Sequence, residues 1–240
     1  MGKREGFTYL EMVMVIIIIG ILATIAKVSI FSPNLTILRD QFLNHFLLTA
    51  STAAKDDKAY YLLPSESGDT TAQLRAKYYF KQFWQFKIMK NSAGEISYCI
   101  FSDQPYTYDK RAHNQYSREV LTDGTGKYLC HDASDNSLIA EENPLVNLTA
   151  HYHITKVLFT YKGKTEQVST NNSIRFLFDN EGNLFMDEGE EGDGGDINPF
   201  DPTARPLMTS PGRLVLCQGD TCERNVTFII YPSGHIVAVK

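Results

Sequence analysis

Four cysteines are the residues of this chain whose chemistry is easiest to anticipate. They are Cys99, Cys130, Cys217 and Cys222, and an even number in an exported protein favours disulfides, with three possible connectivities. Cys217 and Cys222 are close enough to close a short loop, which makes Cys99 and Cys130 the implied second pair. Zinc is the alternative, but neither pair has two-residue spacing and only His131 adjoins a cysteine.

An acidic segment is the second candidate for chemistry. Asp187–Asp196 holds six carboxylates and four glycines in ten residues, which favours an extended, solvated loop over residues 186–201. Calcium is the alternative, because it prefers six to eight oxygen ligands, and its ligands would then be Asp193, Asp196 and Asp201. The spacing does not fit an EF-hand, so we expect no cofactor, with Ca²⁺ as the rival.

Motifs that accompany catalysis are missing. The chain has no phosphate-binding glycine loop, no Gly-x-Ser-x-Gly elbow and no His-Glu-x-x-His pair. His151 and His153 are two residues apart in a segment that reads as a strand, so they are expected on one face, but no third ligand is evident nearby. The sequence therefore predicts a structural protein and not an enzyme.

Length and charge narrow the class further. The chain has 240 residues and a formal net charge of −5. This length suits one domain with a sizeable core, and the acidic balance argues against nucleic acid as a partner.

The N-terminal stretch has the composition of a membrane-spanning segment. Lys3 and Arg4 precede an apolar segment without charge from Met12 to Ala26, which predicts a transmembrane helix over residues 7–30 with the remainder exported. Two alternatives are an ordinary anchor and a cleaved secretory signal ending at Thr24-Ile25-Ala26. The apolar region of a signal normally follows its basic residues directly, and the intervening Phe7-Thr8-Tyr9-Leu10-Glu11 argues against the signal.

The order of residues here resembles the type IV prepilin leader, which pilins share with the pseudopilins of type II secretion. The resemblance is carried by Gly6-Phe7-Thr8, by Glu11 and by the apolar run. It implies that prepilin peptidase removes residues 1–6 by cleavage between Gly6 and Phe7, and that the new amine of Phe7 is methylated. Glu11 would then neutralise the Phe7 amine of a neighbouring subunit. The helix-kinking proline of major pilins is missing, since the first proline is Pro33.

Periodicity predicts the rest of the chain. Apolar residues at helical spacing predict an amphipathic continuation of the helix over residues 31–63, followed by a globular head over 64–240. The stripe comprises Leu35, Leu38, Phe42, Phe46 and Thr49. Alternation and glycine turns predict hairpins over 84–102, 173–185 and 225–237, with strands over 148–161 and 213–217. The last third resembles the C-terminal sheet of minor pseudopilins related to the H subunit.

These observations combine into one expectation about fold and function. The fold class is α+β, with a long transmembrane helix packed on a C-terminal antiparallel sheet, as in pilins. The function implied is a pseudopilin of type II secretion, single-pass in the bacterial inner membrane with its head in the periplasm. Its partners would be prepilin peptidase, other pseudopilins and the inner membrane. Alternatives are a minor pilin of a type IV pilus or DNA-uptake machine, or a membrane-anchored periplasmic binding protein or hydrolase.

Overall fold

The computed structural model describes residues 9–56, 83–103, 118–131, 141–187 and 207–239, without the side chains of residues 10, 11 and 21–33. The predicted leader, Phe7 and most of the acidic segment lie outside the described residues. The calcium candidates Asp193, Asp196 and Asp201 lie outside them as well.

Within the described residues, one long helix precedes ten strands and two short helical turns. The elements in chain order are α1 (Tyr9–Lys55), β1 (Trp84–Lys90), β2 (Ile96–Asp103), β3 (Arg118–Val120), η3 (Pro144–Val146), α4 (Leu148–Tyr152), β4 (Ile154–Tyr161), β5 (Lys164–Gln167), β6 (Ile174–Phe178), β7 (Leu184–Asp187), β8 (Gly212–Gln218), β9 (Arg224–Ile230) and β10 (Ile236–Val239).

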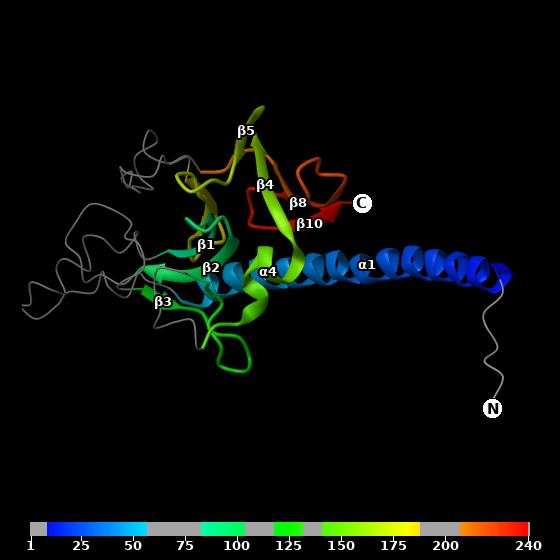
Figure 1. Ribbon diagram of the computed structural model, residues 1–240. Coiled ribbons are helices and arrows are strands. Elements are labelled where there is room, and N and C mark those ends of the chain that lie inside the picture. Colours follow the sequence, from blue (N-terminus) through cyan, green and yellow to red (C-terminus); the bar gives the residue numbers. More distant parts are fainter. Residues whose placement is uncertain (1–8, 57–82, 104–117, 132–140, 188–206, 240) are drawn as a thin grey trace, which may run out of the picture.

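The strands form two antiparallel sheets of five strands each (Figure 1). The first sheet has the order β3-β2-β1-β6-β7, and the second has the order β10-β9-β8-β4-β5. All pairings between neighbouring strands are antiparallel. The inner face of the first sheet is rich in aromatic rings, because alternate residues of β1, β2 and β6 point to that face.

The C-terminal half of α1 packs against both sheets. The predicted apolar stripe is confirmed, since Leu38, Phe42, Phe46 and Thr49 are completely buried and Leu35 packs against the same core. The ring of Phe42 lies 5.0 Å from Phe86 of the first sheet and 4.8 Å from Phe228 of the second, between ring centroids. One helical side chain thus joins the two sheets.

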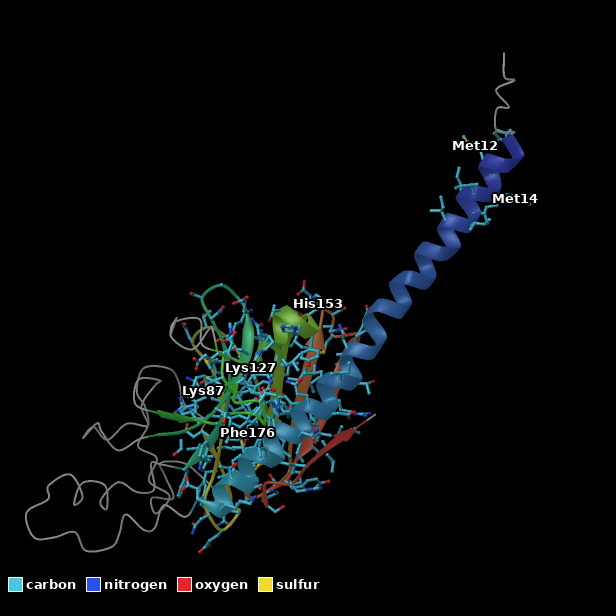
Figure 2. The ribbon with its side chains drawn as sticks, turned by 90° about the horizontal axis from the view of Figure 1, so that it is seen from below. Met12, Met14, Lys87, Lys127, His153 and Phe176 are labelled. Carbon is cyan, nitrogen blue, oxygen red and sulfur yellow. A yellow bond between two sulfur atoms is a disulfide. The ribbon has the colours of Figure 1, made fainter. Side chains whose placement is uncertain are left out.

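Phe46, one turn further along α1, extends the contact between the helix and the sheets. Its ring contacts Phe86 of β1 and both Phe176 and Phe178 of β6, at centroid distances of 5.2 to 5.5 Å. Phe176 in turn lies edge-to-face with Phe159 of the second sheet at 5.4 Å. Figure 2 shows Phe176 in the body of the head, beside the helix. Aromatic packing therefore holds helix and sheets in one core.

The predicted hairpins form, but they do not share a sheet. β6–β7 closes through a turn in which the Asp179 carboxylate accepts hydrogen bonds from the backbone of Glu181 and Asn183, at 3.0 and 2.7 Å. This hairpin belongs to the first sheet, whereas β8, β9 and β10 belong to the second. The expectation of one C-terminal sheet was wrong, because β6 pairs with β1 from early in the chain and β8 pairs with β4.

The predicted fold class is corrected accordingly. The two antiparallel sheets make up most of the described part of the head, so the fold is mainly β, and it is not a transmembrane spine on a single C-terminal sheet. The reason is that hydrophobic alternation identifies strands but does not say which strands pair when their partners are far apart in sequence.

The predicted membrane segment and inner-membrane location are also corrected. In the part of the chain that the structure describes, no helix is long and apolar enough to cross a membrane.

The strand predicted over 148–161 begins later than expected. Leu148–Tyr152 forms the short helix α4, because the side chain of Asn147 caps it by accepting a hydrogen bond from the backbone N–H of Ala150 at 3.0 Å. His153 ends this helix in a left-handed conformation with φ of 55°. His151 and His153 therefore do not share a strand face, and the geometry suggested for a metal pair is absent.

The joint between helix and sheets provides the first testable prediction. Phe46→Ala should lower the free energy of unfolding by about 3–5 kcal/mol, because it removes a fully buried ring from contact with both β1 and β6. Leu47→Ala, on the neighbouring exposed position, is the matched control and should cost less than about 1 kcal/mol. Urea denaturation followed by the fluorescence of Trp84, the one tryptophan of the chain, measures both. Equal losses in the two variants would contradict the packing described.

Candidate assembly surface

The N-terminal part of α1 leaves the head and carries apolar side chains into the open. Figure 2 shows Met12 and Met14 at the far end of the helix, well away from the body of the protein. All eight residues of Met12–Ile19 are apolar, and their side chains are 37–65% exposed. We call this segment the projecting segment.

The projecting segment is apolar on every side. Eight consecutive residues cover more than two turns of helix, so no face is left for polar groups. A helix that is hydrophobic all round is found buried, because covering one Ile, Val or Met side chain contributes about 1.5–3 kcal/mol. The segment is therefore the longest run of consecutive exposed apolar residues in the described part of the chain, and it is suited to burial between other helices.

The residues of the predicted processing site lie at the start of this helix or just before it. Gly6 and Phe7 are outside the described residues. Glu11 falls within α1, less than one turn before the projecting segment, and its side chain is not described. The structure thus places the backbone of Glu11 at the exposed end of the helix and leaves the roles of Gly6, Phe7 and Glu11 as predictions.

A cluster of polar side chains attaches the C-terminal half of α1 to the head. The amide of Gln41 donates to the hydroxyl of Tyr98 at 2.8 Å and to the carbonyl oxygen of Leu145 at 3.1 Å. His45 Nδ1 lies 2.6 Å from the same hydroxyl, and the Tyr152 hydroxyl donates to Gln41 Oε1. We call Gln41, His45, Tyr98 and Tyr152 the joint cluster.

Burial governs the ionisation of the joint cluster. It lowers the pKa of His45 below its ordinary value, although the negative charge of Asp123 acts in the opposite direction. Burial also raises the pKa of Tyr98 well above the usual range and raises the pKa of Tyr152. All three groups are therefore held in their neutral forms around neutral pH.

Two further polar arrangements secure the loops beside β2. The His131 imidazole donates to the Glu142 carboxylate, whose two oxygens lie 2.9 Å from Nδ1, and Glu95 lies 3.7 Å from Nε2. The Asp123 carboxylate accepts from the Thr125 hydroxyl and backbone at 2.7 Å, which lowers the pKa of Asp123 well below its usual range. Both arrangements hold loops in place through side-chain hydrogen bonds.

Both predicted disulfides are present. Cys99 of β2 is bonded to Cys130, and Cys217 of β8 is bonded to Cys222, so no cysteine is free. Cys99 and Cys130 lie in a small buried cluster with Phe101. The first disulfide attaches the loop that carries His131 to the first sheet, and the second closes the turn between β8 and β9.

No group of three or more His, Cys, Asp or Glu side chains suited to a metal occurs among the described residues. Because Asp193, Asp196 and Asp201 lie outside those residues, the calcium alternative stays untested.

The joint cluster was missed by reading the sequence. Gln41 and His45 are one helical turn apart in α1, and this i, i+4 spacing was the one signal available. Tyr98 and Tyr152 come from segments more than fifty residues further along the chain, so nothing local connects them to the helix.

Comparison of the chain with family models, with curated proteins and with solved structures found no match. Arguments about function must therefore come from the chain itself.

The disulfides give the second prediction. Cys99→Ala/Cys130→Ala should lower the free energy of unfolding by about 3–4 kcal/mol and Cys217→Ala/Cys222→Ala by about 2 kcal/mol, because the first bridge closes the longer loop, 31 positions against 5. Denaturation of each double variant measures the losses. Alkylation of the unfolded wild-type chain without reductant is the control, and labelling of any cysteine would show that the bridges are absent.

Proposed function

We propose that this protein is a structural subunit of a helical filament, a pseudopilin of a type II secretion system. The observation that carries the proposal is the projecting segment Met12–Ile19, an all-apolar stretch of helix held away from a folded head. The surface is covered when helices of neighbouring subunits pack around it. The head then lies on the outside of the assembly.

The shape of the subunit supports this arrangement. α1 is one helix of 47 residues, and its C-terminal half belongs to the core of the head. A helix that is fixed at one end and apolar at the other presents its binding surface at a constant distance from the head. Two disulfides in the head favour assembly in an oxidising compartment, which agrees with an exported filament.

The chemistry proposed for the N-terminus is processing followed by charge pairing. Prepilin peptidase cleaves the peptide bond between Gly6 and Phe7, and the amine of Phe7 is methylated. In the filament, the carboxylate of Glu11 then pairs with the positively charged Phe7 amine of a neighbour. Within packed apolar helices this attraction is strong, and a subunit out of register would leave one charge buried without a partner.

The N-terminus of the mature protein provides the third prediction. Mass spectrometry of protein isolated from the native cells should find a chain that begins at N-methylated Phe7. Gly6→Val should leave the leader in place, because the side chain obstructs the approach of the peptidase to the backbone. A mature wild-type chain that begins at Met1 or near Lys27 would refute the processing step and with it the proposed class.

Contacts between helices provide the fourth prediction. With Ile16→Cys in the projecting segment, mild oxidation of intact cells should yield disulfide-linked dimers, because the native cysteines are already paired and each chain then has one free thiol. Lys162→Cys, at the exposed turn between β4 and β5, is the control and should remain monomeric. Adding Glu11→Val to the Ile16→Cys chain should preserve cleavage yet abolish the dimers, since the buried amine then lacks its partner.

The phenotype of a deletion strain distinguishes a pseudopilin of type II secretion from a pilin of a type IV pilus or of a DNA-uptake machine. Deletion of the gene should stop the secretion of folded proteins into the medium and leave surface pili and DNA uptake intact. Normal secretion with loss of either of the other activities would assign the subunit to a pilus or a DNA-uptake machine instead.

A further inference from the structure

The joint cluster has a hydrogen-bond arrangement that depends on the protonation of one residue. Tyr98 is completely buried on β2, and its hydroxyl oxygen accepts a hydrogen bond from the Gln41 amide at 2.8 Å. Nδ1 of His45 lies 2.6 Å from the same hydroxyl, and because the Gln41 amide already donates to the oxygen, we assign the hydroxyl proton of Tyr98 to this nitrogen. For this bond to form, Nδ1 must offer a lone pair, so His45 must be neutral.

The remaining partners prevent an easy rearrangement. The carbonyl oxygen of Gln41 already accepts from the Tyr152 hydroxyl, and the second donor of its amide is held by the Leu145 carbonyl. Gln41 therefore cannot turn to accept the proton of Tyr98 without losing both bonds. When Nδ1 of His45 gains a proton, it can no longer accept from Tyr98, and the hydroxyl proton loses the acceptor that it has in the neutral cluster.

The cluster is in direct contact with the aromatic core of the joint. The Tyr98 ring is stacked on Phe86 at 4.9 Å and lies edge-to-face with Phe42 at 5.7 Å, between centroids. The imidazole of His45 lies edge-to-face with the same tyrosine at 5.8 Å. A movement of Tyr98 or His45 therefore disturbs the rings that hold α1 between the sheets.

We propose that the joint cluster is a pH-sensitive coupling between α1 and the head, in which uptake of a proton by His45 weakens the hold of the head on the helix. This inference does not depend on the proposed function. The coupling is strongest with neutral His45 and weakens as the surroundings become acidic.

The titratable groups around His45 agree with this direction. Tyr98 from β2 and, through Gln41, Tyr152 from α4 are neutral and offer an imidazolium no negative charge. Among the described residues, Asp123 in the loop after β3 is the charged group that favours the imidazolium, and burial outweighs it, so that the pKa of His45 is lowered. A group whose pKa is lowered on folding takes up its proton more readily in the unfolded chain.

The sign of the pH dependence follows from this. The contribution of His45 to stability is fully present above the pKa of the unfolded residue, about 6.5, and is lost as the pH falls below that value. Below about pH 6.5, the unfolding equilibrium constant should rise by up to about tenfold for each unit by which the pH falls.

The fifth prediction tests this coupling in the full chain, kept soluble in a mild nonionic detergent. Urea unfolding followed by Trp84 fluorescence is measured from about pH 7.5 to 5.5, above the range in which carboxylates titrate. The Trp84 indole donates to Asp56, just beyond the end of α1, at 2.8 Å, so its emission reports on the attachment of the helix. The ratio of unfolding constants, wild type over His45→Gln, should increase on acidification, because glutamine can accept from Tyr98 and does not titrate.

Two further variants make the outcome decisive. His151→Gln removes an exposed histidine of α4, and its ratio to wild type should stay constant with pH. Tyr98→Phe removes the hydroxyl and should reduce the pH dependence, which would remain unchanged if His45 were merely buried. If either variant of the cluster fails to fold, NMR titration of the His45 ring in the wild-type chain replaces the comparison. A pKa at or above about 6.5, or a ratio that is constant with pH, would overturn the proposal.

Discussion

The packing of Phe42 and Phe46 between the two sheets is the contact on which the rest of the structure depends. Each sheet presents an apolar inner face, and a five-stranded sheet with such a face is stable only when the face is covered. The two rings of α1 cover both faces at once, because Phe42 touches Phe86 and Phe228, which belong to different sheets. The helix is therefore a part of the core of the head and not an appendage to it.

This constraint determines what the projecting segment can do. A continuous helix of 47 residues is about 70 Å long, and its buried half is fixed by the core. Whatever covers Met12–Ile19 thereby fixes the position and orientation of the head as well. A flexible linker at this point would satisfy the same apolar side chains but would leave the heads without a defined arrangement. The continuity of α1 is thus a feature that supports the proposed filament.

The sequence predicted the features that depend on near neighbours. The stripe from Leu35 to Thr49 and the hairpins with turns at Gly94 and Gly182 follow from periodicity and from glycines with positive φ, of 89° and 85°. The division into two sheets was not predicted, because it depends on pairings such as Phe86 with Phe176, whose partners are far apart in the chain. Alternating hydrophobicity also concealed α4, where the cap supplied by Asn147 outweighed the strand-like pattern.

The residues of the candidate site also divide into those that the sequence predicts and those that only the folded chain brings together. Gly6, Phe7 and Glu11 were identified from a local motif, whereas the joint cluster needed the folded chain to bring its members together. The cluster also shows why polar groups occur inside an otherwise aromatic joint. Apolar packing is non-directional, so rings alone would allow α1 to rotate or slide. Hydrogen bonds are sensitive to tenths of an ångström, and the bonds from Gln41 and His45 to one hydroxyl determine a single axial position for the helix. The same directionality makes that position depend on a proton.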